Sequence, residues 1–201
     1  MSTMPIEIYT DGSSLNNPGA SGLAYIIKYW IDNDNEEMPI IKTIEANQGF
    51  RLSTNNRMEI MSAIYGLKKI IELINTDEAF KDFTQINLFT DSQYLSSAIN
   101  NRWLQSWRQR NWMTSGFGGK APTAVKNKDL WEQVIELQDT LHNMSINLTI
   151  THVKGHNGNE FNEKADKLAV AASNDTVNHQ IDEYYEKNSN IMNKRNYQTY
   201  S

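Results

Sequence analysis

Residues 6–19 read IEIYTDGSSLNNPG, and the rest of the predicted fold is arranged around this stretch. Its first residues alternate isoleucine with polar or aromatic side chains, a pattern typical of a β-strand. Gly12 and the pair Pro18 and Gly19 then predict turns. Asp11 is therefore expected where a strand ends, with its carboxylate at the edge of a sheet.

Two more strands are predicted directly after this stretch. Leu23–Trp30 and Ile40–Phe50 are rich in β-branched and aromatic residues, and the polar residues 32–39 between them suit a hairpin turn. Three successive strands with short connections predict an antiparallel meander.

The remainder of the chain alternates helices with strands. Residues 55–74 place apolar side chains at the spacing of one buried helical face. Further helices are predicted at 94–99, 102–108, 129–141 and 160–172, and strands at 85–89 and 146–151. The resulting order, βββαβαααβα, predicts an α/β fold with a five-stranded mixed sheet, three strands antiparallel and two parallel, flanked by helices.

Length and composition predict one folded domain over residues 1–173 of the 201-residue chain, which is 39% hydrophobic and 21% charged. Residues 174–201 contain six asparagines and four tyrosines and few aliphatic residues, and we expect a flexible polar segment there. No apolar run approaches the roughly 20 residues of a membrane span, and no signal peptide fits before the first strand, which favours a cytoplasmic protein. Because the chain has no cysteine, a metal site must use oxygen or histidine ligands.

Four carboxylates adjoin predicted element ends, and each has an ordinary local explanation. Asp11 before a glycine suits a tight turn. Glu59 has the spacing of a helix capping box, and Asp91 that of an N-cap. Asp166 fits a solvated helix face. Taken singly, these structural roles suffice, so the chemical argument depends on the whole set.

The predicted topology brings the four carboxylates together. If the strands before Asp11 and Asp91 are parallel neighbours, their carboxyl ends share the sheet edge where α/β folds place ligand sites. The helices that carry Glu59 and Asp166 reach the same edge. Two unit charges ~4 Å apart repel by about 4 kcal/mol at an effective dielectric constant of 20, so such a cluster requires counterions. Carboxylate ligands favour Mg²⁺, with Mn²⁺ as a substitute, and two such ions can clamp both oxygens of a phosphodiester displacement.

Four motifs occur in order along the chain: TDGSSLNNPG at 10–19, STNNRME at 53–59, TDSQYL at 90–95 and VKGHNGNEFNEKADKLA at 153–169. They resemble the motifs of type 1 ribonuclease H over residues 5–172. The resemblance implies a catalytic domain without the amino-terminal hybrid-binding module. It also implies endonucleolytic hydrolysis of the RNA strand of RNA/DNA hybrids, giving 5′-phosphate and 3′-hydroxyl ends. By the same resemblance, two Mg²⁺ ions are bound by Asp11, Glu59, Asp91 and Asp166, while His156 assists proton movement or product release and Glu163 lies beside the ligands.

Residues 102–128 contain six basic residues and no acidic one, although the whole chain has a net charge of −5. Such a local excess is typical of contact with phosphates. The resemblance implies a basic protrusion here, with Trp107 along the deoxyribose backbone and one or two of the nearby tryptophans packed inward. Tryptophans at helical spacing are also ordinary core residues.

Short amide side chains suit a shallow minor groove, because each can donate to and accept from hydroxyls and base edges. One departure concerns the pocket for a DNA phosphate, which by resemblance contains Thr54 and Asn127. Some relatives have an arginine two residues before the threonine, where this chain has Leu52, with Arg51 one position earlier. The pocket is therefore expected to be weaker or differently built. The residues that the resemblance places on the substrate of a monomeric enzyme are Asn17, Thr54, Asn55, Asn56, Gln93, Trp103, Trp107, Arg108, Arg110 and Asn127.

Two alternatives remain open at this point. A catalytically idle module that only binds RNA/DNA hybrids would share the fold, but it need not keep four clustered carboxylates. A nuclease that acts on DNA junctions or integration intermediates would keep them, but the amide set and the Trp/Arg region argue against it. The sequence therefore favours a hybrid-specific ribonuclease.

Overall fold

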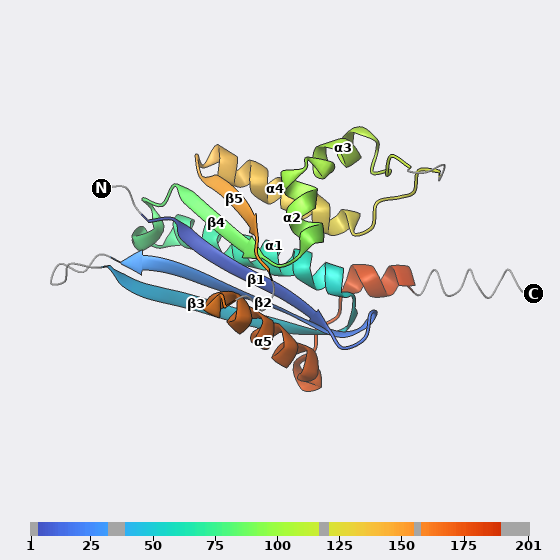
Figure 1. Ribbon diagram of the computed structural model, residues 1–201, viewed down its shortest axis with the longest axis horizontal. Helices are drawn as coiled ribbons and strands as arrows, with labels where there is room; N and C mark the ends of the chain where they lie inside the picture. Colours follow the sequence, from blue (N-terminus) through green and yellow to red (C-terminus); the bar gives the residue numbers. More distant parts are fainter. Residues whose placement is uncertain (1–3, 32–38, 117–120, 155–157, 190–201) are drawn as a thin grey trace, which may run out of the picture.

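The computed structural model describes residues 4–31, 39–116, 121–154 and 158–189 and contains one five-stranded sheet in the order β3-β2-β1-β4-β5 (Figure 1). β1 pairs antiparallel with β2, and β2 with β3, while β1–β4 and β4–β5 are parallel. The predicted mixed sheet is thus confirmed. The strands are β1 Ile6–Ser14, β2 Gly19–Ile31, β3 Ile40–Ser53, β4 Gln85–Thr90 and β5 Asn147–His152.

Helices cover both faces of this sheet, with α5 across one face and α1 across the other (Figure 1). The predicted order of elements is confirmed, and most helix ends lie within two residues of the prediction. Residues 183–189 are also helical. The other helices are α1 Asn55–Thr76, η1 Glu78–Phe80, α2 Gln93–Asn100, α3 Trp103–Gln109, α4 Lys128–Asn143, α5 Glu160–Asn174 and η2 Thr176–Asn178.

Two apolar layers hold the helices to the sheet. Because successive strand residues point to opposite faces, Ile8 of β1 joins the large core under α1 and α4, whereas Tyr9 faces α5. In the large core Trp131 of α4 is completely buried. On the α5 side the ring of Tyr9 stacks between Phe89 and Phe161, with centroids 4.8 and 5.3 Å away. Tyr9 thus fixes α5 against the strands that precede Asp11 and Asp91.

β1 is longer than its sequence suggested. Asp11 was expected at a strand end, but it pairs with Ala24 of β2, and the antiparallel ladder continues to Ser14. The parallel ladder with β4 stops earlier, at the pair of Thr10 and Thr90. Asp11 therefore follows the last β1–β4 pair while β2 still holds its backbone.

The chain after α5 differs from the flexible segment expected for residues 174–201, because through residue 189 it packs on the domain. Gln180 exchanges backbone hydrogen bonds with the end of β3, donating to Gly49 and accepting from Arg51. Asp182 is only 5% exposed. Residues 183–189 lie beside the start of α1 (Figure 1), and residues 190–201 fall outside the described part of the chain. Within that part, no helix is long and apolar enough to cross a membrane.

Candidate active site

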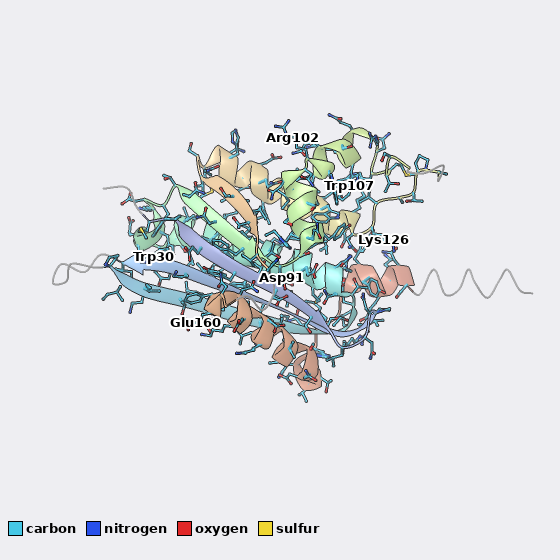
Figure 2. The ribbon with its side chains drawn as sticks, viewed as in Figure 1. Trp30, Asp91, Arg102, Trp107, Lys126 and Glu160 are labelled. Atoms are coloured by element: carbon cyan, nitrogen blue, oxygen red, sulfur yellow. The ribbon has the colours of Figure 1, made fainter. Side chains whose placement is uncertain are left out.

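Asp11 and Asp91 lie next to each other where the parallel pairing of β1 and β4 ends. The two strands pair as far as Thr10 and Thr90, and each aspartate is the next residue along the chain. Asp91 is half-buried, whereas Asp11 is 7% exposed and accepts a 2.6 Å hydrogen bond from the Gly12 backbone. Figure 2 shows Asp91 at the centre of the molecule, beneath the region that carries Arg102 and Trp107.

Glu59 reaches this edge because the backbone of α1 lies in direct contact with the backbone of β1 at Gly12. A Cβ atom on Gly12 would lie 2.4 Å from the backbone nitrogen of Glu59, so only glycine permits the contact. The Glu59 carboxylate is held from two sides. It accepts hydrogen bonds from the side-chain amide of Asn55, at 2.7 Å, and from the hydroxyl of Ser92, which follows Asp91.

Asp166 belongs to α5, which lies equally close to the sheet. A Cβ atom on Gly22 of β2 would lie 2.2 Å from the carbonyl oxygen of Ala169. This contact fixes the helix one turn beyond Asp166, which is half-buried on the side facing β1. Two close backbone approaches, at Gly12 and Gly22, thus bring helices from both faces of the sheet to one edge.

The four carboxylates interact electrostatically. Burial raises the pKa of Asp11 from 3.8 to about 8, and the negative charges of Asp91, Asp166 and Glu59 add to the increase, while the Gly12 hydrogen bond opposes it. Burial also raises the pKa of Glu59, with Asp91 again contributing, although the Ser92 hydroxyl opposes the shift. The set that the sequence predicted therefore does come together, and its members disfavour one another's ionised forms.

The donor chemistry of this edge fits a hard divalent cation. Carboxylate oxygens predominate, and a cation would relieve the repulsion that raises the pKa of Asp11. Asn162, one helical turn before Asp166, is 3% exposed, and its Oδ1 has no hydrogen-bond partner among the described residues. Buried oxygens of this kind are ordinarily satisfied by water, including metal-bound water. As placed, no three His, Asp or Glu side chains of the described residues form a complete ligand set.

The local explanations for three of these carboxylates do not match the structure. Thr54, rather than a residue paired with Glu59, caps α1 by accepting from the backbone of Arg57. Ser92, rather than Asp91, caps α2. Asp11 lies inside a strand ladder, not in a turn. The two capping roles are therefore filled by other residues, and no turn occurs at Asp11.

The predicted minor-groove amides lie around the carboxylates. The side chain of Asn17 accepts a 3.2 Å hydrogen bond from the Asn55 backbone, and Asn55 in turn donates to Glu59. Asn56, at the start of α1, and Gln93, at the start of α2, are exposed. The structure thus joins Asn17 and Asn55 directly to the acidic set.

The Trp/Arg region forms α3 and the following turn, with Arg108 and Arg110 exposed. Trp107 was expected along the deoxyribose backbone, but it is half-buried, and its ring centroid lies 5.8 Å from that of Trp131 in the core. Trp103 is the more open ring, at 38% exposure. Trp107 therefore packs partly inward, and Trp103 is the more exposed of the two rings.

Thr54 and Asn127, expected to hold a DNA phosphate, both contact Arg57. The Thr54 hydroxyl accepts from the Arg57 backbone at 3.4 Å, and the guanidinium donates to Asn127 Oδ1 at 3.5 Å. Arg51 does not replace the arginine missing at Leu52, because it forms a bidentate pair with Glu186, at 2.8 and 2.7 Å.

Sequence reasoning missed the ion-pair cluster around Arg57. Asp129 and Asp182 both bind its guanidinium, although they lie 72 and 125 residues away along the chain. The one available signal was a charged residue amid the apolar pattern of α1. Of the other predicted residues, Glu163 is half-buried in the first turn of α5, and His156 lies outside the described residues.

Two surface hollows of the described residues lie away from the carboxylates. One, of about 400 Å³, adjoins β3, the end of α5 and η2, and another, of about 290 Å³, lies between α3 and α4. The acidic edge is therefore not part of either hollow.

Comparisons with known proteins show which family this chain belongs to. The family model described as RNase H matches residues 3–174. The chain is 40% identical over 173 residues to the Ribonuclease H of Treponema denticola, covering 84% of this chain and 97% of the relative. It is 38% identical over 171 residues to the Ribonuclease H of Nitratidesulfovibrio vulgaris, covering 85% and 90%.

Solved structures show the same fold. LC9-RNase H1, described as a type 1 RNase H with the type 2 active-site motif, matches with a TM-score of 0.63 and 25% identity over 86% of this chain and 74% of that one. LC11-RNase H1, solved in complex with an RNA/DNA hybrid, matches with a TM-score of 0.55 and 20% identity over 86% and 99%. The family model and the curated relatives together show that this chain belongs to the ribonuclease H family.

Proposed function

We propose that this chain, as a monomer, hydrolyses the RNA strand of RNA/DNA hybrids endonucleolytically with two divalent cations, giving 5′-phosphate and 3′-hydroxyl ends, and that residues 1–173 carry the activity. The observation that supports this most is the placement of Asp11 and Asp91 directly after the last β1–β4 pair, where Asp166 and Glu59 also act on Asp11 and, with burial and Asp91, raise its pKa to about 8. Four carboxylates that oppose one another's ionisation at the end of a sheet are suited to share cations.

Asp11, Glu59, Asp91 and Asp166 would hold Mg²⁺, or Mn²⁺ in its place. When bound, the cations supply an activated water and stabilise the charge that develops on the leaving 3′-oxygen. The protein's own part is to hold the carboxylates in position. Ser92 and Asn55 fix the two oxygens of Glu59, and the Gly12 backbone fixes one oxygen of Asp11.

Recognition of the hybrid would divide between its two strands. The amides of Asn17, Asn55, Asn56 and Gln93 adjoin the acidic set and can donate to and accept from 2′-hydroxyls and base edges. Thr54 and Asn127 would hold a phosphate of the DNA strand. The exposed Trp103, Arg108 and Arg110 would follow the same strand, since guanidinium groups bind phosphate and an open ring can lie along deoxyribose.

The proposal is tested with three end-labelled duplexes of one sequence, an RNA/DNA hybrid, double-stranded RNA and double-stranded DNA, each incubated with the protein and Mg²⁺. We expect cutting of the RNA strand in the hybrid alone, with 5′-phosphate ends, and no cutting when a chelator is present. Asp91→Asn tests whether the acidic set carries the cutting. Asp139→Asn, a matched change at an exposed carboxylate of α4, serves as its control. Tight binding of the hybrid without turnover would instead identify an idle binding module.

A further inference from the structure

Residues 175–189 lie beyond the stretch matched by the RNase H family model, which ends at residue 174. They are nevertheless anchored at several points. His179 lies 3.1 Å from the carbonyl oxygen of Ala172, and Gln180 pairs with the end of β3. Asp182 accepts a 2.7 Å hydrogen bond from Ser53, the last residue of β3. A segment held in this way has a fixed position relative to the substrate-binding side of the domain.

Asp182 is the point at which this segment meets α1. Its carboxylate binds the Arg57 guanidinium through two hydrogen bonds, Nε to Oδ2 at 2.6 Å and Nη2 to Oδ1 at 2.9 Å. Both side chains are almost completely buried, at 2% and 3% exposure. The ring of Tyr184 lies 5.3 Å from the guanidinium carbon, and Tyr185 lies 6.0 Å from it. The segment thus encloses the charged end of Arg57.

Arg57 also contacts α4. Its two terminal nitrogens donate to Asp129 at 2.9 and 2.8 Å, and one of them reaches Asn127 at 3.5 Å. Burial opposes the charge of Arg57, but the hydrogen bonds with Asp129 and Asp182 outweigh it and raise the pKa of the guanidinium above its ordinary value. Arg57 is therefore a permanent cation whose orientation two carboxylates determine together.

This orientation matters for the two residues that the proposed function assigns to a DNA phosphate. The Arg57 backbone binds the Thr54 hydroxyl, and the Arg57 guanidinium reaches Asn127. Thr54 and Asn127 occupy the N-cap positions of α1 and α4, so Arg57 ties together the beginnings of two helices. If Asp182 no longer held one side of the guanidinium, only Asp129 would define where it points.

We infer that Asp182 is a positioning residue for DNA-strand binding, which through Arg57 holds Thr54 and Asn127 at the spacing that fits one phosphate of that strand. The inference rests on the proposed function. It assigns a role in substrate binding to the segment after α5. It also explains why Arg51 does not serve this pocket in place of an arginine at Leu52. Arg51 and Ser53 lie two residues apart on one side of β3, and both face the segment after α5.

The test is a coupling experiment between Asp182 and single phosphates of the DNA strand. A set of hybrids carries one neutral methylphosphonate at successive positions of the DNA strand, and KM and kcat are measured with Mg²⁺ for the parent and for Asp182→Asn. In the parent, one position should raise KM about tenfold, the size expected for a lost charge-assisted hydrogen bond. In Asp182→Asn, KM for the unmodified hybrid should already be raised by a similar factor, and that methylphosphonate should raise it by less than threefold further. kcat should stay within about twofold.

Two controls separate positioning from general loss of stability. Glu186→Gln breaks the exposed pair with Arg51 in the same segment, and Ile146→Val shortens a core side chain that none of these contacts involves. Both should keep the full methylphosphonate effect. If Asp182→Asn does not fold, Ser53→Ala removes one hydrogen bond to the same carboxylate and leaves all charges in place, so it should show the same coupling in weaker form.

The inference is overturned if the parent cleaves the hybrid and Asp182→Asn shows the same methylphosphonate effect as the parent, or if KM falls in Asp182→Asn, which would mean that the segment competes with substrate. A parent protein that cuts no hybrid overturns the proposed function itself, so the two failures are distinguishable.

Discussion

At the scale of single residues, the burial and charge of Asp11 explain why the acidic site is unstable without a cation. Asp11 is 7% exposed, and three other carboxylates act on it. Folding must remove this group from water and bring it near like charges, which costs free energy unless the group is protonated or a cation is present. The acidic site therefore lowers the stability of the folded domain, and the packing of the rest of the domain must offset this cost.

Asp91→Asn should reduce hybrid cleavage by roughly 100-fold or more, because one ligand of a cation worth several kcal/mol to the transition state is lost. With a chelator present, the variant should be as stable as the parent or more stable, since one repulsive charge beside Asp11 has been removed. Thermal unfolding in chelator checks this. A variant that melts well below the parent would show that Asp91 is a structural residue, although Ser92 is the observed cap of α2.

Asp11→Asn should change how stability depends on pH. Folding raises the pKa of Asp11 from 3.8 to about 8, so the folded state binds the proton more tightly than the unfolded state. The stability contributed by this proton is fully present below pH 4 and is lost as pH rises to 8 and beyond. In chelator, the variant should exceed the parent by on the order of 2 to 5 kcal/mol at pH 8, and the difference should shrink toward pH 4. Urea unfolding at both pH values measures it, and equal differences at both would contradict the raised pKa.

The acidic quartet could be predicted from the sequence because each member follows a strand or lies on a helix whose place the element order determines. The cluster around Arg57 could not. Arg57 falls within an otherwise apolar helical face, and its partner Asp182 lies 125 residues away in a segment without a clear period. Pairs of this kind depend on tertiary packing, which neither periodicity nor spacing encodes.

At the scale of elements, close backbone contacts place the helices. α1 crosses β1 where a Cβ on Gly12 would lie 2.4 Å from the backbone nitrogen of Glu59 and 2.6 Å from the backbone carbon of Met58. Backbone atoms within a helix cannot move aside separately, so any larger residue must push the helix and strand apart. The distance between Asp11 and Glu59 depends on this contact.

Gly12→Ala should therefore destabilise the protein by about 3 kcal/mol or more and abolish most hybrid cleavage. The control is Gly66→Ala on α1, where the new Cβ would meet side-chain atoms and no backbone: Cγ2 of Ile8 at 2.9 Å, and Cβ and Cγ of Tyr25 at 3.4 and 3.6 Å. Because alanine also favours helix, we expect this variant to stay within about 1 kcal/mol of the parent. Urea unfolding of both compares them, and equal losses would argue against the close contact.

Element order and strand pairing could be predicted because periodicity and short connections restrict the topology strongly. The extension of β1 to Ser14 could not, because Gly12 and the serines after it carry turn signals that the ladder with β2 overrides. Trp107 is a similar case. Its spacing suited either a core or a surface residue, and only the packing against Trp131 shows that one side of its ring is buried.

At the scale of the whole molecule, an acidic protein carries one basic region. The net charge is −5, yet residues 102–128 contain six basic residues and no acidic one. This segregation favours approach of a polyanion from one side, while the acidic edge requires cations before phosphate can come near. Hybrid binding should accordingly depend on salt and on divalent cations together.

The double variant Arg108→Gln, Arg110→Gln should bind the hybrid more weakly and with a weaker salt dependence. Each lost phosphate contact reduces the slope of log K against log salt by about 1, so the double change should reduce it by about 2. Binding is measured with Ca²⁺ at several salt concentrations. The control is Lys81→Gln, which removes the charge of an exposed lysine directly after η1. An unchanged slope would remove these arginines from the interface.

The binding of cations by the acidic site, on which the proposed function depends, is best tested by counting the protons released when Mg²⁺ binds. Asp11 makes this possible, because its proton must leave before a cation can bind. With a pKa of about 8, Asp11 is largely protonated at pH 7, and a cation must displace that proton. Calorimetry in two buffers of different ionisation enthalpy should show nearly one proton released per chain in the parent and close to none in Asp11→Asn. Magnesium binding with no proton release in the parent, or no magnesium binding at all, would contradict a carboxylate site held ready for cations.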